Sequence, residues 1–230
     1  MTYKQYITHL MTILDTHYPT EVVCYLDHET PFQLLIATIL SAQCTDDRVN
    51  IVTKDLFKQC PSVEDFDAIS LEALEEAIRS TGFYKNKAKN IKSCTAKLLE
   101  LHQGIVPSDI ESLTQLAGVG RKTANVIRGN IFNIPSIVVD THVKRISIRL
   151  GLTLNTDPVA IEKDLMYLLP KEHWIRYNTQ VIAHGRAICT ARSPKCAECM
   201  FLKTCPFGLQ RTLDALPMQV QETIQKGHMY

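Results

Sequence analysis

The sequence predicts an all-α fold, and two observations support that prediction. Apolar residues recur at helical spacing along most of the 230-residue chain, for example within residues 3–17. The one strand-like stretch, residues 134–139, is short and is interrupted by Pro135. Because a parallel sheet needs several strands that alternate with helices, the pattern favours helices packed on helices.

Capping residues and glycines mark the expected ends of these helices. Residues 3–17 form the first helix, and Pro31 opens a second one, PFQLLIATIL, which is apolar on all sides and is therefore expected to be buried. Further helices are expected to begin at Ser70, at Ser108 with Glu111 as a capping box, and at Asp157, which precedes Pro158. Helix ends are expected at Gly82 and Gly104.

Composition places the chain among soluble globular proteins of one large or two small domains. Hydrophobic residues make up 45% and charged residues 21%, so a normal buried core is expected. No stretch approaches the roughly 18 uninterrupted apolar residues of a membrane span, and the N-terminus lacks a secretory signal. We therefore expect a cytoplasmic protein with no membrane partner. The segment QVQETIQKGHMY at 219–230 is compatible with a short helix or with disorder.

Basic residues are concentrated in two windows although the net charge is only +1. Residues 118–149 contain six basic residues against the single acid Asp140, and residues 184–205 contain four against Glu198. Such asymmetry is typical of a surface that binds a polyanion. Scattered charges also produce basic windows by chance, and that alternative stays open.

Four cysteines lie close together near the C-terminal end, with the spacing C-x6-C-x2-C-x5-C. They are Cys189, Cys196, Cys199 and Cys205. Disulfides are disfavoured because nothing in the sequence directs the chain to an oxidising compartment. Zinc remains a rival, but structural zinc sites usually take their ligands as two closely spaced pairs, and only one such pair is present. The spacing therefore favours an iron–sulfur cluster over zinc without excluding zinc.

Residues 116–132, LAGVGRKTANVIRGNIF, predict a helix–turn–helix hairpin with an anion site at its turn. Gly118 and Gly120 permit a tight turn and close approach to the backbone amides. The following helix presents its N-terminus there, and Arg121, Lys122 and Thr123 favour phosphate. No strand precedes the turn and no GxxxxGK[ST] motif is present, which argues against a nucleotide-binding loop. A helix–helix turn without any ligand is the remaining alternative.

Asp140 in VVDTHV lies where an apolar run stops and a helix is expected to start at Thr141. A helix N-terminus favours the ionised form of a carboxylate, although many aspartates at such positions are only N-caps. A lysine on a phosphate-binding turn and an ionised aspartate form a usable chemical pair. Lys122 is then the candidate nucleophile.

Five segments together resemble the endonuclease III family of helix-hairpin-helix DNA glycosylases, over residues 3–207. They are LAGVGRKTANV, VVDTHV, SAQCTD at 41–46, GFYKNKAKNI at 82–91 and the cysteine cluster. The resemblance implies two helical lobes with a DNA groove between them. One lobe would be a helical barrel of residues 24–135 that carries the hairpin; the other would join residues 1–23 to residues 136–230 and hold the iron–sulfur cluster.

The resemblance also implies a bifunctional DNA glycosylase and AP lyase of base excision repair. It would remove oxidised pyrimidines from damaged double-stranded DNA, acting as a monomer associated with the nucleoid. Lys122 would attack C1′ of a flipped nucleotide and form a Schiff base, and the strand would be nicked by β-elimination. Asp140, on the opposite side of the groove, would stabilise the charge that develops on the sugar.

Further roles are implied by the same resemblance. Gln43 would fill the gap left by the flipped nucleotide, and Phe83 would wedge the opposite strand. For Gln43 the alternative is a polar residue at a helix end; for Phe83 an ordinary core aromatic is the favoured interpretation, since the family commonly has a smaller aliphatic residue there. The four clustered cysteines would bind a structural 4Fe-4S cluster whose loop holds Arg192 and Lys195 against phosphates.

Two other functions remain open. An adenine mismatch glycosylase of the same superfamily would lack the lysine nucleophile, so Lys122 argues against it. A non-catalytic DNA-binding protein with a redox-sensing cluster is the alternative from a different class. The sequence does not rank oxidised pyrimidines as substrates, nor base release against strand nicking.

Overall fold

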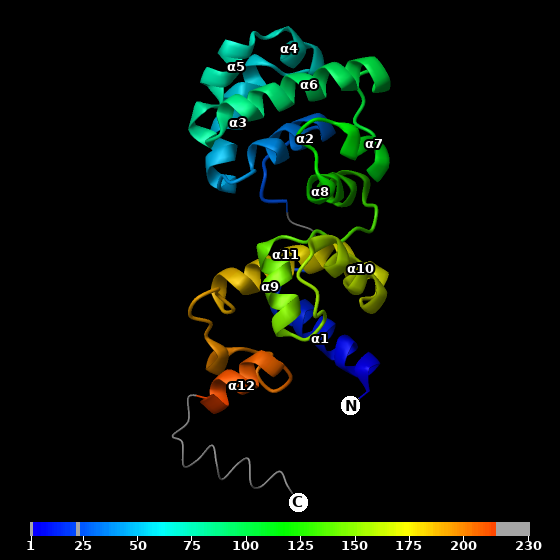
Figure 1. Ribbon diagram of the computed structural model, residues 1–230, viewed down its shortest axis with the longest axis vertical. Helices are drawn as coiled ribbons and strands as arrows, with labels where there is room; N and C mark the ends of the chain where they lie inside the picture. The colour runs from blue at the N-terminus through cyan, green and yellow to red at the C-terminus, as the bar shows by residue number, and fades with distance from the viewer. Residues whose placement is uncertain (1, 22–23, 215–230) are drawn as a thin grey trace, which may run out of the picture. The chain divides into compact units, whose positions relative to one another are not determined.

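The computed structural model describes residues 2–21 and 24–214, and in this range all regular secondary structure is helical (Figure 1). The residues described contain no strand, and residues 134–139 have no regular structure. The all-α prediction is thereby confirmed. The chain divides into two compact units: unit 1 comprises Met1–Val22 and Ile137–Tyr230, and unit 2 comprises Val23–Ser136. Each unit has its own hydrophobic core.

Unit 2 is built around one buried helix. Its helices are α2 (Pro31–Leu40), α3 (Asp46–Gln59), α4 (Val63–Ala68), α5 (Leu71–Ala77), the 3₁₀ helix η1 (Arg79–Thr81), α6 (Tyr84–His102), α7 (Ile110–Gln115) and α8 (Arg121–Phe132). Every residue of α2 after Pro31 is buried, and α2 packs against α3, α6 and α8. The apolar PFQLLIATIL run is the sequence basis of this arrangement, because a helix that is apolar all round needs neighbours on all sides.

Unit 1 joins the N-terminal helix to the C-terminal part of the chain. Its helices are α1 (Tyr3–His17), α9 (Thr141–Arg149), α10 (Pro158–Leu168), the 3₁₀ helix η2 (Lys171–His173), α11 (Trp174–Ala187), the 3₁₀ helix η3 (Cys196–Glu198) and α12 (Pro206–Asp214). The fully buried Tyr177 on α11 lies in this core, where its hydroxyl group pairs with the Ser147 hydroxyl group at 2.9 Å. Asp15 on α1 accepts two hydrogen bonds from Arg176 on α11, each 3.0 Å long.

Most of the expected helix ends are found, and one is shifted. Ser70 and Asp157 cap α5 and α10 through their side chains. The cap of α7, however, is Asp109 rather than the predicted Ser108: the Asp109 carboxylate accepts a hydrogen bond from the backbone N–H of Ser112 at 2.7 Å. A carboxylate caps at least as well as a hydroxyl, so the residue one position later begins the helix.

Two glycines occupy expected helix ends. Gly104 follows Gln103, the left-handed C-cap of α6, and Gly82 ends the 3₁₀ helix η1. No helix in the described range is long and apolar enough to cross a membrane. The two conformations expected for residues 219–230 concern a segment outside the described range.

Candidate nucleic-acid interface and metal centre

The hairpin predicted at residues 116–132 forms as expected. Helix α7 ends before Leu116, a short turn follows, and α8 begins at Arg121 with Gly120 as its N-cap. No side chain caps the start of α8. The first backbone hydrogen bond of this helix runs from the Ala124 N–H to the Gly120 carbonyl at 2.9 Å. The N-terminus of a helix of this length presents amide donors and a partial positive charge, which suits a phosphate group.

The two hairpin glycines have different surroundings. Gly118 has a φ of +79°, and a Cβ placed on it would lie 3.1 Å from Asn90 Cβ and 3.3 Å from Ile39 Cγ2. Gly120 has an ordinary extended backbone (φ −84°, ψ 175°), and a Cβ there would meet nothing within 4 Å. Gly118 is therefore required by the fold, because the turn is pressed against α2 and α6. Gly120 leaves open space in front of α8.

The first turn of α8 carries the other predicted hairpin residues. The Arg121 and Lys122 side chains are exposed and that of Thr123 is half-buried. The candidate nucleophile is thus accessible on the helix end that the glycine turn leaves open.

Asp140 in unit 1 is the N-cap of α9, as the sequence indicated. Its Oδ1 accepts a hydrogen bond from the Val143 N–H at 2.7 Å, and its Oδ2 lies 3.6 Å from His142 Nδ1. Burial lowers the pKa of His142. The neighbouring Asp140 acts to raise this pKa, whereas the nearby Arg145 and Arg186 lower it further. The carboxylate is fixed by the helix end, and 14% of its side-chain surface remains exposed.

Gln43 and Phe83 both lie at exposed loop positions of unit 2. Gln43 follows the C-cap of α2 and Phe83 precedes α6, and both have left-handed backbones, with φ of 54° and 49°. The Phe83 side chain is 65% exposed. The interpretation of Phe83 as a core aromatic is therefore wrong, because its place between Gly82 and the start of a helix turns the ring outward.

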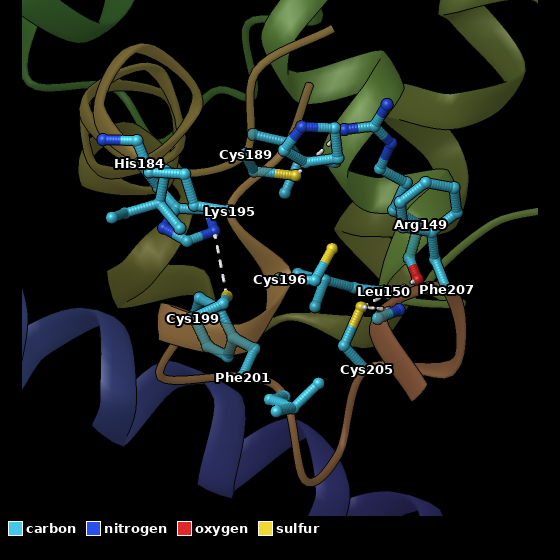
Figure 2. A pocket seen from close by; sticks show the side chains of 15 residues that line it. Arg149, Leu150, His184, Cys189, Lys195, Cys196, Cys199, Phe201, Cys205 and Phe207 are labelled. Atoms are coloured by element: carbon cyan, nitrogen blue, oxygen red, sulfur yellow. Dashed lines mark hydrogen bonds between the residues drawn. The ribbon is translucent and has the colours of Figure 1, made fainter. Parts of the chain in front are cut away.

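All four clustered cysteines line one pocket in unit 1 (Figure 2). Cys189 follows α11, Cys196 and Cys199 bracket η3, and Cys205 precedes α12. All eight cysteines of the chain are free thiols in the structure, which contradicts the disulfide alternative. The rest of the pocket is mainly apolar, with Ile146, Leu150 and Phe201 among its walls.

Three of the four cysteine sulfurs have hydrogen-bond partners. The Arg149 guanidinium group donates to Cys189 Sγ at 3.2 Å, the Gly208 N–H donates to Cys205 Sγ at 3.3 Å, and His184 Nε2 lies 3.7 Å from Cys199 Sγ. Arg149 and His184 are not among the site residues predicted from the sequence. Both precede the cluster on helices, and only the packing of α9 and α11 brings them to the sulfurs.

Both ring nitrogens of His184 have a hydrogen-bond partner. Burial lowers its pKa to about 4 and raises the pKa of Tyr18 to about 12, so the ring is neutral and the phenol keeps its proton. The Tyr18 hydroxyl group and His184 Nδ1 share a hydrogen bond of 2.8 Å, and His184 Nε2 faces Cys199.

The donor set of this pocket suits a metal cluster bound by thiolates. Burial raises the pKa of the Cys199 thiol to about 11 and that of Cys205 above its usual value, so a bound metal would have to displace these protons. No three His, Cys, Asp or Glu side chains in the described range come close enough to hold a single metal ion. That result does not bear on a multi-iron cluster, in which each thiolate binds a different iron.

The loop between Cys189 and Cys196 carries the two predicted phosphate contacts of unit 1. Arg192 and Lys195 are both exposed. The Lys195 N–H donates to the Ile188 carbonyl at 3.0 Å, and the Arg149 guanidinium group binds the carbonyls of Thr190 and Ala191. The loop is thus tied to α9 and α11 at both ends, while both of its basic residues are exposed.

Comparison with known proteins agrees with these features. Residues 36–171 match the model of the HhH-GPD superfamily base excision DNA repair protein. The chain is 50% identical to endonuclease III of Synechocystis sp. over 88% of this chain and 93% of that protein. It is 48% identical to endonuclease III of Bacillus subtilis over 82% of this chain and 86% of that protein.

Solved structures give the same result. A trapped endonuclease III–DNA covalent intermediate is similar with a TM-score of 0.86 and 45% identity, over 92% of this chain and all of that one. A non-covalent endonuclease III–DNA complex has the same TM-score and identity. A thermostable thymine-DNA glycosylase, 21% identical, shares the fold with a TM-score of 0.78. The chain belongs to the endonuclease III family of the HhH-GPD superfamily, and is a bifunctional DNA glycosylase and AP lyase of base excision repair.

Proposed function

We propose that the chain removes oxidised pyrimidines from duplex DNA and nicks the abasic strand, with Lys122 as the nucleophile. The observation that carries the proposal is the position of Lys122: its exposed side chain stands on the first turn of α8, directly after a glycine turn that leaves amide donors open. That the related enzyme has been trapped as a covalent DNA intermediate supports a nucleophilic mechanism.

The reaction proceeds through a covalent bond to the sugar. Lys122 Nζ attacks C1′ of a flipped nucleotide, the N-glycosidic bond breaks, and the base leaves with its electron pair and takes up a proton. Loss of the amine protons and opening of the sugar ring give the imine. The imine acidifies the proton at C2′, and its removal expels the 3′ phosphate by β-elimination. Each step uses only the amine, the sugar and proton transfer.

Asp140 acts on the same deoxyribose as a fixed negative charge. Its Oδ1 is held by the α9 backbone, and Oδ2 faces His142. A carboxylate held in place before the reaction stabilises positive charge on the sugar without reorganising, and it can accept a proton from the attacking amine.

Groups at the start of α8 and on the cysteine loop bind the duplex. The α8 amides at Gly120, together with Arg121 and Thr123, grip a phosphate, and Arg192 and Lys195 on the cysteine loop contact further phosphates. Gln43 occupies the gap left by the flipped nucleotide and Phe83 wedges the opposite strand. These contacts need one copy of the chain, so we propose a monomer.

The four clustered cysteines bind a 4Fe-4S cluster. Their shared apolar pocket and the nitrogen atoms that face three of the sulfurs support this assignment. The cluster supplies structural bonds that hold the loop with Arg192 and Lys195, and takes no part in the steps above. Purified protein should contain about four irons per chain; zinc in equal amount to protein would refute the assignment.

Borohydride trapping tests the nucleophile. Lys122→Ala should abolish the covalent adduct with abasic duplex DNA while largely preserving DNA binding. Lys89→Ala, which removes an exposed lysine from α6 of the same unit, is the matched control and should trap normally. If Lys122→Ala still forms the adduct, another amine is the nucleophile. If cluster-loaded wild-type protein forms none, the chain is a DNA-binding protein without lyase activity.

A further inference from the structure

Two loops of unit 2 meet at one buried lysine that the mechanism does not use. Lys87 on α6 is only 4% exposed, and its ammonium group donates a 2.8 Å hydrogen bond to the Leu40 carbonyl and another to the Thr81 carbonyl. Leu40 is the last residue of α2, and Thr81 is the last residue of η1. The lysine therefore links the ends of two segments that are 41 residues apart in sequence.

Each linked carbonyl lies beside one of the two residues assigned to insert into DNA. Gln43 is three residues after Leu40, and Phe83 is two residues after Thr81. Both are exposed and both have left-handed backbones, a conformation that costs an L-residue about 1–2 kcal/mol and persists only where its surroundings hold it. Two exposed residues with strained backbones thus follow, within three positions, the two carbonyls that Lys87 links.

We propose that Lys87 is a positioning residue that holds the Gln43 and Phe83 loops at a fixed spacing, so that both side chains enter damaged duplex DNA together. The inference rests on the DNA-inserting roles proposed above. One residue fills a gap in one strand while the other separates the opposite strand, so the distance between the two loops must match the separation of the strands. Displacement of such a loop by about 1 Å can lower the reaction rate by roughly 100-fold.

A lysine suits this place better than a neutral side chain. The C-terminal carbonyls of a helix have no partner within the helix, and a cation there also interacts favourably with the helix dipole. An ammonium group has three donors on one nitrogen, so it can bind carbonyls from two segments at once. Burial lowers the pKa of Lys87, which the nearby Cys44 opposes.

The experiment compares a reaction that needs insertion with one that does not. Lys87→Met keeps an unbranched side chain, one atom shorter, and removes the donors; Lys89→Met, which changes an exposed lysine on the same helix, is the matched control. Base release from a duplex with one thymine glycol needs both loops. Borohydride trapping on a single-stranded abasic oligonucleotide needs only Lys122.

Lys87→Met should lower the duplex rate by roughly 10- to 100-fold and the single-strand rate by no more than about twofold. It should also reduce the fluorescence change of 2-aminopurine placed opposite an abasic analogue at saturating protein. Lys89→Met should leave the ratio of the two rates unchanged. Equal losses on both substrates, or no loss on the duplex, would overturn the inference.

Two further variants complete the test. Lys87→Arg keeps donors and charge and should restore part of the duplex-to-single-strand ratio, whereas a ratio as low as that of Lys87→Met would count against positioning by hydrogen bonds. Gln43→Ala combined with Phe83→Ala tests the underlying assignment. If this pair leaves the ratio and the fluorescence at wild-type values, the insertion roles fail; if it lowers both while Lys87→Met lowers neither, only the role of Lys87 fails.

Discussion

Substitution by alanine should have different effects at the two glycines of the hairpin: at Gly118 it should lower stability, and at Gly120 it should lower DNA affinity. Gly118→Ala forces an L-residue into a backbone with φ of +79°, which costs about 1–2 kcal/mol. The new methyl group would lie 3.1 Å from Asn90 Cβ and 3.3 Å from Ile39 Cγ2, and crowding of this kind in a packed region costs about 1–3 kcal/mol. Together these terms predict a loss of about 2–5 kcal/mol in the free energy of unfolding.

Gly120→Ala is the matched control within the same turn. Its backbone is ordinary for alanine and its Cβ would meet nothing within 4 Å, so the loss should stay below about 1 kcal/mol. The methyl group would, however, project into the space in front of α8 where a phosphate is proposed to bind. Affinity for an abasic-analogue duplex should therefore fall about tenfold, which corresponds to about 1.4 kcal/mol.

Thermal unfolding followed by circular dichroism separates the two effects. At about 2–4 °C per kcal/mol, Gly118→Ala should lower Tm by about 4–20 °C, while Gly120→Ala should change it by only a few degrees. DNA affinity is measured well below both transitions by fluorescence anisotropy. Equal Tm values for the two variants would refute the argument that Gly118 is needed for folding, and unchanged affinity of Gly120→Ala would refute the phosphate site.

Three other outcomes are expected. Asp15→Asn should lower the free energy of unfolding by about 1 kcal/mol at pH 7, because hydrogen bonds from Arg176 and Gln180 outweigh the effect of burial and lower the pKa of Asp15. This stabilisation is present above the unfolded-state pKa near 4 and is lost as the pH falls below it. In urea unfolding experiments, the free energy of unfolding of the variant should therefore change less between neutral and acid pH than that of the wild type. Phe83→Gly should leave Tm unchanged or slightly raised while lowering duplex activity, and Gln103→Gly, which relieves the same kind of backbone strain, should leave activity unchanged. Arg149→Met removes the guanidinium bonds to the loop after Cys189 and should speed the loss of visible absorbance of the cluster in air.

Features that depend on local sequence were predictable. The hairpin, its flanking helices and the caps at Ser70 and Asp157 all depend on residues within one or two turns of each other. The prediction of Ser108 as a cap is wrong because Ser108 and Asp109 are adjacent and either side chain can cap α7. In the structure, the Ser112 N–H donates to the Asp109 carboxylate. Sequence pattern alone does not distinguish neighbouring residues that can form the same hydrogen bond.

Features that depend on distant contacts were not predictable in the same way. Phe83 has the large apolar side chain of a typical core residue, but its position between Gly82 and the start of α6 leaves it exposed. Lys87 lies in a segment rich in lysine and looks solvated when read one residue at a time. Its place on the stripe that also contains Ala88, Ile91, Cys94 and Leu98, all buried on α6, is the signal that could have identified it.

Backbone strain is distributed unevenly over the described residues. Four non-glycine residues there have positive φ: Gln43, Phe83, Gln103 and Asn133. Gln103 and Asn133 are C-caps of α6 and α8, where a left-handed residue is a common way to end a helix. Phe83 instead occupies the N-cap of α6, a position usually extended, and Gln43 lies beyond the C-cap of α2.

Helix capping therefore explains the left-handed backbones of Gln103 and Asn133. It does not explain those of Gln43 and Phe83, which carry the proposed DNA-inserting side chains. Their strain, about 1–2 kcal/mol each, has to be offset by the packing of α2 and α6 beneath them. Gly118 presses the hairpin turn onto residues of the same two helices, Ile39 and Asn90. The groups proposed to grip the backbone and to enter the stack thus share one rigid base in unit 2, so loosening that base should impair both DNA contacts before it unfolds the chain.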